Sequence, residues 1–157
     1  MSKKPDCISN YMITDVITLN KNDDFEQAVD IFEKHKIRCV PVIDDAGVFC
    51  GTFSLHTVIK KISPLAAQSE SAMSLNFFTT GIDFIRDKYQ SIKDQKIDIF
   101  LDKEAPKIKA DVHFMEVLNV LIHGGSPVSV VDPKTHKLLG IFTYQEAFKL
   151  MRAPKKK

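Results

Sequence analysis

The sequence predicts an α/β (α+β) fold built from two copies of one small βαββα unit. Residues 19–54 resemble residues 108–143 at an offset of 88 or 89 positions, which indicates an internal duplication. Each copy carries an apolar stripe at helical spacing, followed by two β-rich runs around a turn. The 157 residues, of which 44% are hydrophobic and 27% charged, suit one ordinary domain or two small packed halves.

The first copy begins with a β-branched run and continues into a helix. Asn22 or Asp23 offers an N-cap for this helix. One helical face is apolar and consists of Phe25, Ala28, Val29 and Phe32. The other predicted elements are a strand at 16–19, a hairpin of strands at 39–43 and 48–53, and a short helix at 55–62. The hairpin turn at 44–47 has the Asp and Gly residues that favour turns.

The second copy repeats this order with a weaker first strand. Asp111 is the expected N-cap of its helix, and Gly124 with Gly125 ends that helix. The apolar stripe consists of Phe114, Val117, Leu118 and Leu121. The other predicted elements are a strand at 106–108, a hairpin of strands at 128–131 and 138–142, and a short helix at 144–151.

A connection separates the two copies. Residues 63–71 are expected to form a loop, and residues 82–92 an amphipathic helix with Ile82, Ile85 and Tyr89 on one face. This helix either packs on its own domain, which we favour, or forms a dimer contact or a lid. The resulting organisation is repeat 1 at 8–62, a connection at 63–95, repeat 2 at 96–151 and a basic tail at 152–157.

Charge and composition argue against several classes of function. A net charge of +2 is too small to argue for nucleic acid, and the lysines at 155–157 suit a solvated tail better than an anionic partner. No apolar run could span a bilayer, and no signal core follows the polar N-terminus, so we expect a cytoplasmic protein without membrane insertion.

Chemistry-bearing motifs are also missing from the sequence. Cys7, Cys39 and Cys50 have no metal-ligand spacing, and none of the five histidines forms a paired metal motif. No nucleophile elbow, P-loop or dinucleotide fingerprint occurs. Asp44 and Asp45 sit in a hairpin turn, where aspartate is expected for backbone reasons. We therefore expect no metal site, no required cofactor and no catalysis.

Two pairs of motifs resemble the cystathionine β-synthase (CBS) domain. In the first copy these are residues 36–44, Lys-Ile-Arg-Cys-Val-Pro-Val-Ile-Asp, followed by Gly-Thr-Phe-Ser at 51–54. The second copy has the corresponding runs at 123–132 and 140–146. The resemblance implies a stand-alone pair of repeats, packed sheet to sheet about a pseudo-twofold axis and joined into a homodimer. It also implies that AMP, ADP, ATP or S-adenosylmethionine binds between the repeats as a regulatory ligand.

The resemblance implies that each cleft takes a hydroxyl and an acid from one copy and strands from the other. The better cleft would consist of Thr143, Glu146, Val16, Ile17, Arg38 and Pro41. A hydroxyl at a helix start, with nearby N–H groups, suits a phosphate, and an acid one turn later suits ribose hydroxyls. A strand cation neutralises the phosphate. Glu146 replaces the usual aspartate and is one methylene longer.

The weaker cleft would consist of Ser54, Thr57, Ile108, Ser126 and Ser129. Thr57 replaces the acid and Ser129 replaces the strand proline, so we expect this cleft to bind nucleotides weakly or not at all. Two functions stay open. One is a regulatory module that senses an adenosyl ligand and signals to an unknown protein partner. The other is a ligand-free scaffold for dimerisation or protein interaction, in which Thr143 and Glu146 merely cap a helix.

Overall fold

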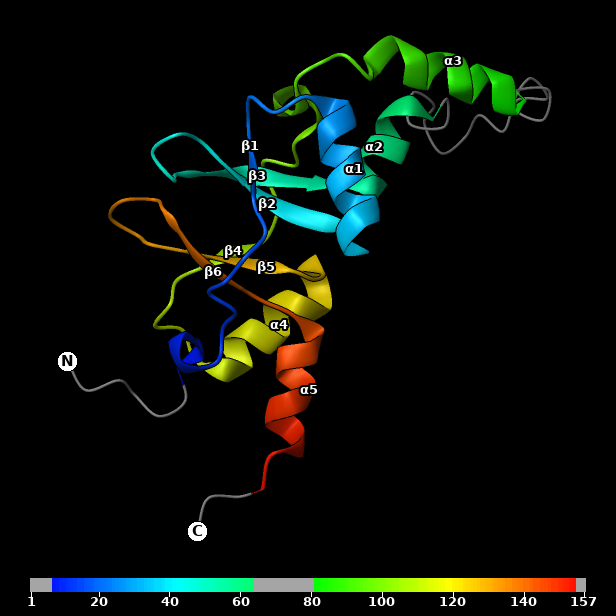
Figure 1. Cartoon of the computed structure of the whole chain (residues 1–157). Helices are drawn as coiled ribbons and strands as arrows, with labels where there is room; N and C mark the ends of the chain where they lie inside the picture. The colour runs from blue at the N-terminus through cyan, green and yellow to red at the C-terminus, as the bar shows by residue number, and fades with distance from the viewer. Residues whose placement is uncertain (1–6, 64–80, 155–157) are drawn as a thin grey trace.

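The computed structural model describes residues 7–63 and 81–154, and these residues form two similar α/β halves (Figure 1). Each half has a three-stranded sheet, in the order β1-β2-β3 in the first and β4-β5-β6 in the second. The helices lie on the outer sides of the two sheets in Figure 1. The predicted fold class is therefore confirmed.

The first half contains β1 (Leu19–Asn20), α1 (Phe25–His35), β2 (Cys39–Ile43), β3 (Phe49–Ser54) and α2 (Leu55–Ile62). β1 pairs with β2 in parallel, and β2 pairs with β3 antiparallel, with Pro41 opposite Thr52. Its core is aromatic: Phe25 lies edge-on to Phe53, and Phe32 stacks on Phe53 with 5.4 Å between ring centroids. The apolar stripe predicted for the first helix faces this core.

The second half repeats the arrangement with β4 (Lys107–Ile108), α4 (Phe114–Gly124), β5 (Val128–Val131), β6 (Leu138–Phe142) and α5 (Tyr144–Arg152). Ser129 lies opposite Lys107 on one side and Ile141 on the other. The core is mostly aliphatic and is built around Val117, Leu121, Val128 and Val130. Both halves thus use one topology with different core side chains.

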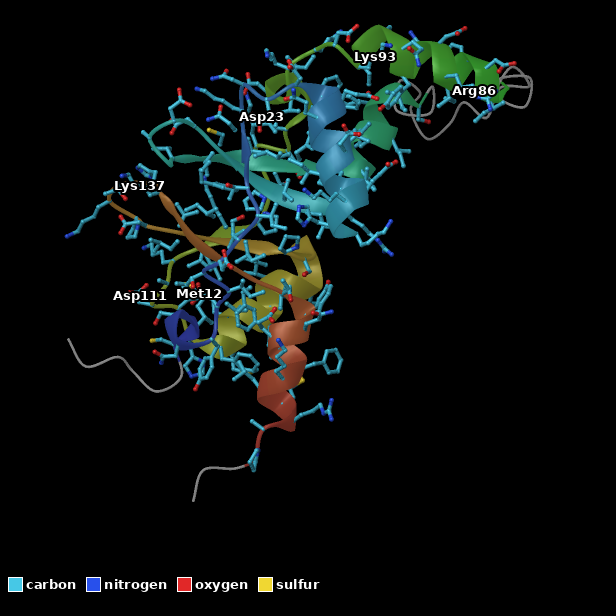
Figure 2. The ribbon with its side chains drawn as sticks, in the orientation of Figure 1. Met12, Asp23, Arg86, Lys93, Asp111 and Lys137 are labelled. Atoms are coloured by element: carbon cyan, nitrogen blue, oxygen red, sulfur yellow. The ribbon has the colours of Figure 1, made fainter. Side chains whose placement is uncertain are left out.

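The two halves exchange the segments that precede their first strands. The N-terminal turn η1 (Ile8–Asn10) packs in the second core, where Ile8 is fully buried. The turn η4 (Ile97–Phe100) packs in the first core, where Ile97 is fully buried. Figure 2 accordingly shows Met12 close to Asp111 on the second half. The packing therefore does not follow the repeat boundaries 8–62 and 96–151.

Two equivalent pairs of main-chain hydrogen bonds fix this exchange. Ile13 and Ile141 each donate to the other's carbonyl oxygen at 2.9 Å. Thr52 donates to Asp102 at 3.0 Å, and Asp102 donates back at 2.9 Å. Each pair lies beside a glycine that has no room for a side chain. A Cβ on Gly51 would stand 2.6 Å from the Asp102 oxygen, and a Cβ on Gly140 would overlap the Ile13 oxygen. The two glycines therefore permit the close crossing of the exchanged segments.

The connection contributes one helix, α3 (Ile82–Ile92), at the residues predicted for it. It docks on the first half: the Tyr89 ring lies edge-on to Phe25, and its hydroxyl donates to Glu26 at 2.7 Å. Lys96 forms an ion pair with Asp24 at 2.6 Å just after the helix. Figure 2 shows Arg86 and Lys93 at the end of the first half that faces away from the second half. The helix therefore packs on its own chain, as we favoured.

Several local predictions are wrong. The strand predicted at 16–19 is instead β1 at Leu19–Asn20, because pairing with Val42 and Ile43 selects those two residues. Asp23 does not cap α1, since its carboxylate accepts from the Asn20 N–H at 2.8 Å; Asp24 is the N-cap. The N-cap of α4 is His113 and not Asp111. Except for Ser63, the predicted loop at 63–71 lies outside the described residues, as do the lysines at 155–157.

Candidate functional site

A cavity of about 520 Å³ lies where the end of α1 and the start of β2 meet the N-terminus of α5. We call it the α5 cavity. Figure 1 shows these ends approaching one another across the junction of the two halves. The cavity is lined by Lys36, Ile37, Arg38, Cys39, Ser126, Pro127, Ile141, Thr143, Tyr144 and Gln145. It therefore draws on both repeats, as the resemblance implied for a ligand cleft.

The N-terminus of α5 presents N–H groups to this cavity. The Thr143 side chain accepts from the Gln145 N–H at 3.1 Å, and Ser126 Oγ accepts from the Tyr144 N–H at 3.4 Å. The first bond is at the long end of the usual range, and the second is longer than that range. These N–H groups carry the positive end of the helix dipole, so an anion could replace the two hydroxyls as their partner.

The other wall of the cavity is cationic. Lys36 is the C-cap of α1 and has a left-handed backbone with φ of 55°, which turns the chain into β2. Arg38 follows at the start of the strand and is exposed. Within the described parts of the chain, neither side chain forms an ion pair, and no carboxylate lines the cavity. The cavity therefore carries net positive charge.

Glu146, the predicted ribose acid, does not line the cavity. Its residue is 6% exposed, and its carboxylate accepts from the Thr143 hydroxyl and pairs with Lys149 at 3.1 Å. Burial raises the pKa of this carboxyl, but the hydrogen bonds from Thr143 and Lys149 together lower it by more, so the pKa lies below its ordinary value. Glu146 is thus an ionised partner of its own helix cap in this state.

The structure brings together only part of the better predicted cleft. Arg38 and Thr143 line the α5 cavity, whereas Val16, Ile17 and Pro41 do not. Pro41 is buried within β2, and Ile17 is 39% exposed in the segment before β1. Sequence reasoning missed Lys36 and Gln145. The position of Lys36 just after an apolar helical stripe was the available signal, since a helix C-terminus favours a cation.

The weaker predicted cleft is not assembled as one cavity. Ser54 caps α2 by accepting from the Thr57 N–H at 3.0 Å, and the two hydroxyls lie 2.8 Å apart. Ser126 instead lines the α5 cavity, and Ile108 lines a different cavity. Ser129 is fully buried, and its hydroxyl has no hydrogen-bond partner among the described residues. Of these five residues, Ser126 and Ile108 thus line two different cavities, and Ser129 lies in the interior.

The Cys39 thiol forms a neutral part of the α5 cavity wall. Burial raises its pKa to about 11, against a smaller opposing effect of a hydrogen bond with Thr52. The thiol therefore stays protonated near neutral pH and is a poor nucleophile. Among the described residues, no cluster of His, Cys, Asp and Glu could hold a metal ion, and no helix is long and apolar enough to cross a membrane.

Comparison with known proteins finds likeness at the level of sequence in the first repeat. Residues 8–64 match the family model of the CBS domain. Inosine-5'-monophosphate dehydrogenase of Thermoplasma acidophilum is 32% identical over 59 residues, which are 38% of this chain and 12% of that enzyme. The chain thus spans a small fraction of that relative's length.

Solved structures resemble the whole arrangement. A CBS domain-containing protein of unknown function from Bacillus anthracis has a TM-score of 0.71 at 16% identity, covering 95% of this chain and 94% of that one. CBSX2 in complex with AMP has a TM-score of 0.66 at 15% identity, covering 93% and 98%. CbpB in complex with c-di-AMP has a TM-score of 0.66 at 13% identity, covering 92% and 83%. At these identities the likeness shows the fold.

The family match covers the first repeat, and the fold match extends over both. Gly51 and Gly140 with their crossing segments, the matched hairpins and the capped helices give the two halves one plan. Residues 8–64 therefore match the CBS domain, and the described length of the chain has the fold of the CBS-domain proteins that it resembles.

Proposed function

We propose that this protein is a regulatory module that binds a phosphate-bearing adenosyl ligand at the α5 cavity and signals its presence to a partner protein. One observation carries the proposal: Lys36 and Arg38, which form no ion pair with any described residue, face the N-terminus of α5 across a cavity whose lining has no carboxylate. This arrangement suits a phosphate group. The complexes of CBSX2 with AMP and CbpB with c-di-AMP, proteins of the same fold, support an adenine nucleotide as the ligand.

The cavity chemistry ranks the candidate ligands. AMP, ADP, ATP and c-di-AMP carry negative phosphates, whereas the sulfonium of S-adenosylmethionine is cationic and would meet Lys36 and Arg38. Glu146 could contact ribose hydroxyls only after leaving Thr143 and Lys149. We therefore propose that the phosphate supplies most of the affinity and the ribose little.

The module acts by binding and not by catalysis in this proposal. Its three cysteines are free thiols, which suits the reducing cytoplasm. Large apolar side chains on α4 and α5 are exposed, with Ile122 at 73%, Phe148 at 64% and Met151 at 57%. Exposed apolar side chains of this size suit a protein contact, so we propose homodimerisation through α5.

Calorimetric titration with AMP, ADP, ATP, c-di-AMP, S-adenosylmethionine and adenosine tests the proposal. We expect a phosphate-bearing ligand to bind, and Arg38→Gln to weaken it about tenfold while changing adenosine little. Lys60→Gln is the matched control, because Lys60 is an exposed α2 lysine away from the cavity and should bind like the wild type. Equal losses for AMP and adenosine would refute the phosphate role.

A ligand-free scaffold is the second candidate. It is favoured by the closed Thr143–Glu146–Lys149 arrangement and by Thr57, which supplies no acid to α2. If folded protein shows no heat with any nucleotide at millimolar concentration, the scaffold is the better description. Light scattering after gel filtration then decides whether it is a dimer, and Phe148→Ser should convert such a dimer to monomer.

A further inference from the structure

A second cavity, of about 490 Å³, lies between the two β-hairpins. We call it the hairpin cavity. Figure 1 shows the hairpin tips on the opposite side of the sheets from the start of α5. Val48 and Phe49 of the first repeat form one wall, and Lys107, Lys109 and Val131 of the second repeat contribute to the other. The hairpin cavity shares no lining residue with the α5 cavity. Of the residues that the resemblance implied for the two clefts, Ile108 alone lines the hairpin cavity.

Main-chain hydrogen bonds between the repeats hold these walls in place. The Phe49 N–H donates to the His136 oxygen at 3.0 Å, and the Leu138 N–H donates to the Gly47 oxygen at 3.1 Å. A bridge between Val48 and Lys137 lies between these bonds. The cavity is therefore pre-formed by the junction of the hairpins, and filling it requires no rearrangement of the backbone.

The polar groups of the hairpin cavity are mainly cationic. Lys107 in β4 and Lys109 just after it lie on either side of Ile108, which packs in the second core, and both lysines line this cavity and also a neighbouring one. Over residues 7–63 and 81–154, no carboxylate pairs with either ammonium group. The only lining carboxylate there is Asp132, and its Oδ1 already accepts from the N–H groups of Lys134 and Thr135 at 2.8 and 2.7 Å.

Apolar side chains form the remainder of the cavity. Phe49, Val131 and Pro133 line it, and Val131 is 8% exposed. The volume falls within the range of about 300–1,000 Å³ that is typical of small-molecule sites. An apolar surface with a few convergent charged groups is the usual composition of such sites. A free inorganic ion would leave this apolar surface unused.

We propose that the hairpin cavity binds a small organic anion, whose carboxylate or phosphate lies between Lys107 and Lys109 and whose apolar body packs on Phe49 and Val131. This site is independent of the proposed nucleotide site. Because the ligand contacts both hairpins, it stabilises the junction between the repeats and raises the melting temperature of the protein by mass action.

Amide NMR titration with benzoate, phenyl phosphate, benzamide and inorganic phosphate tests the site with defined probes. We expect benzoate or phenyl phosphate to shift the amides of Phe49, Val131 and His136, and the comparison of these two probes distinguishes carboxylate from phosphate. Neutral benzamide and inorganic phosphate should bind about tenfold more weakly, because each lacks one half of the recognised chemistry.

Two variants and one control separate the effect of charge from the effect of shape. Lys107→Gln with Lys109→Gln should weaken benzoate or phenyl phosphate about tenfold. Lys60→Gln with Lys103→Gln removes the same charge elsewhere and should bind like the wild type. Val48→Trp should fill the cavity and abolish binding while all charges remain. The proposal would be overturned by any of three results. These are unchanged binding in the Lys107→Gln, Lys109→Gln variant, benzamide binding as tightly as benzoate, and amide shifts confined to Thr143 and Gln145 of the α5 cavity. Nucleotide titration of Thr143 and Gln145 tests the proposed function separately.

Discussion

The two repeats share their backbone plan and differ in their polar groups. Gly51 and Gly140 are equivalent and each lies beside a crossing segment. The residues just after α1 and α4, however, differ. Lys36 follows α1 where Gly125 follows α4, and Arg38 precedes β2 where the second repeat has Ser126. The helix starts also differ, with Ser54 and Thr57 in one repeat and Thr143 and Glu146 in the other.

This difference separates the positions at which the fold restricts the side chain from those at which it does not. The crossing segments come within van der Waals distance of the sheet, so a side chain at either glycine would break both the hydrogen bonds and the exchange of segments. Polar groups at the junction have no such constraint. Their divergence leaves the cations on the first repeat and the capping hydroxyl of Thr143 on the second, so the two walls of the α5 cavity differ in charge.

The largest expected effect comes from breaking the shared feature. Gly51→Ala and Gly140→Ala should each lower the free energy of unfolding by about 3 kcal/mol or more, because the new Cβ overlaps a backbone oxygen. Urea denaturation measures this. Gly81→Ala is the control: its Cβ meets no described atom within 4 Å, so only the preference for glycine at the N-cap of α3 is lost, and a cost of at most about 1 kcal/mol is expected. If Gly140→Ala alone is neutral, the crossing is required only in the first repeat.

The helix ends should respond in opposite directions. Gly125 has φ of 84° and ψ of −171°, a region that only glycine adopts easily, so Gly125→Ala should cost about 2 kcal/mol. Lys36 has φ of 55°, so Lys36→Gly should stabilise the fold by about 1 kcal/mol. Thermal and urea unfolding measure both. A loss of stability in Lys36→Gly would mean that the lysine side chain stabilises the first repeat more than its backbone strains it.

Ser129 and Pro41 occupy equivalent strand positions, and only Ser129 buries an unpartnered hydroxyl. Ser129→Ala should therefore stabilise the protein by about 1 kcal/mol, because it removes a buried polar atom without a partner. Ser126→Ala makes the same change where the hydroxyl accepts from Tyr144, and should cost about 0.5 kcal/mol. Equal effects at the two sites in urea unfolding would contradict this account.

The smallest effect concerns α3, which only the first repeat carries. Tyr89→Phe removes the hydrogen bond to Glu26 and should cost about 0.5 kcal/mol at neutral pH. Burial and the hydrogen bond to Glu26 raise the pKa of Tyr89 from 10.0 to about 12. The protonated hydroxyl is favoured in the folded state, so its contribution is complete below pH 10 and is lost between pH 10 and 12.

Comparison of unfolding curves between pH 9 and 12 tests this pH dependence. The wild type should lose stability more steeply than Tyr89→Phe above pH 10, because the variant lacks the titrating hydroxyl. Parallel curves for the two proteins would show that Tyr89 titrates alike in the folded and unfolded chains.

Local elements were largely predictable because their signals are local. The helix bounds at 55–62 and 82–92 agree with α2 and α3, since apolar spacing and flanking breakers determine them. The caps were not predictable in the same way. Asp23 has the preferred N-cap chemistry, but the preceding turn uses its carboxylate, and Asp24 takes the N-cap position without a capping hydrogen bond from its side chain, which pairs with Lys96 instead. Competition between two nearby backbone sites decides such a case.

The candidate site was predictable only in part. Arg38 and Thr143 came from motif positions, and they line one cavity. Ser126 was assigned to the other cleft, and Glu146 was assigned to a ligand although it pairs with Thr143 and Lys149. Side-chain pairing within a helix cap depends on distances that motif spacing does not report.

The sequence by itself determined the duplication, the order of the elements and the apolar faces, because periodicity and turn chemistry act over a few residues. The tertiary structure alone decided that Ile8 packs in the second core and Ile97 in the first. It also decided that Lys36 meets α5, and that Lys107 and Lys109 share a cavity with Phe49. These contacts join segments far apart in the chain, and only the packing of the whole fold brings them together.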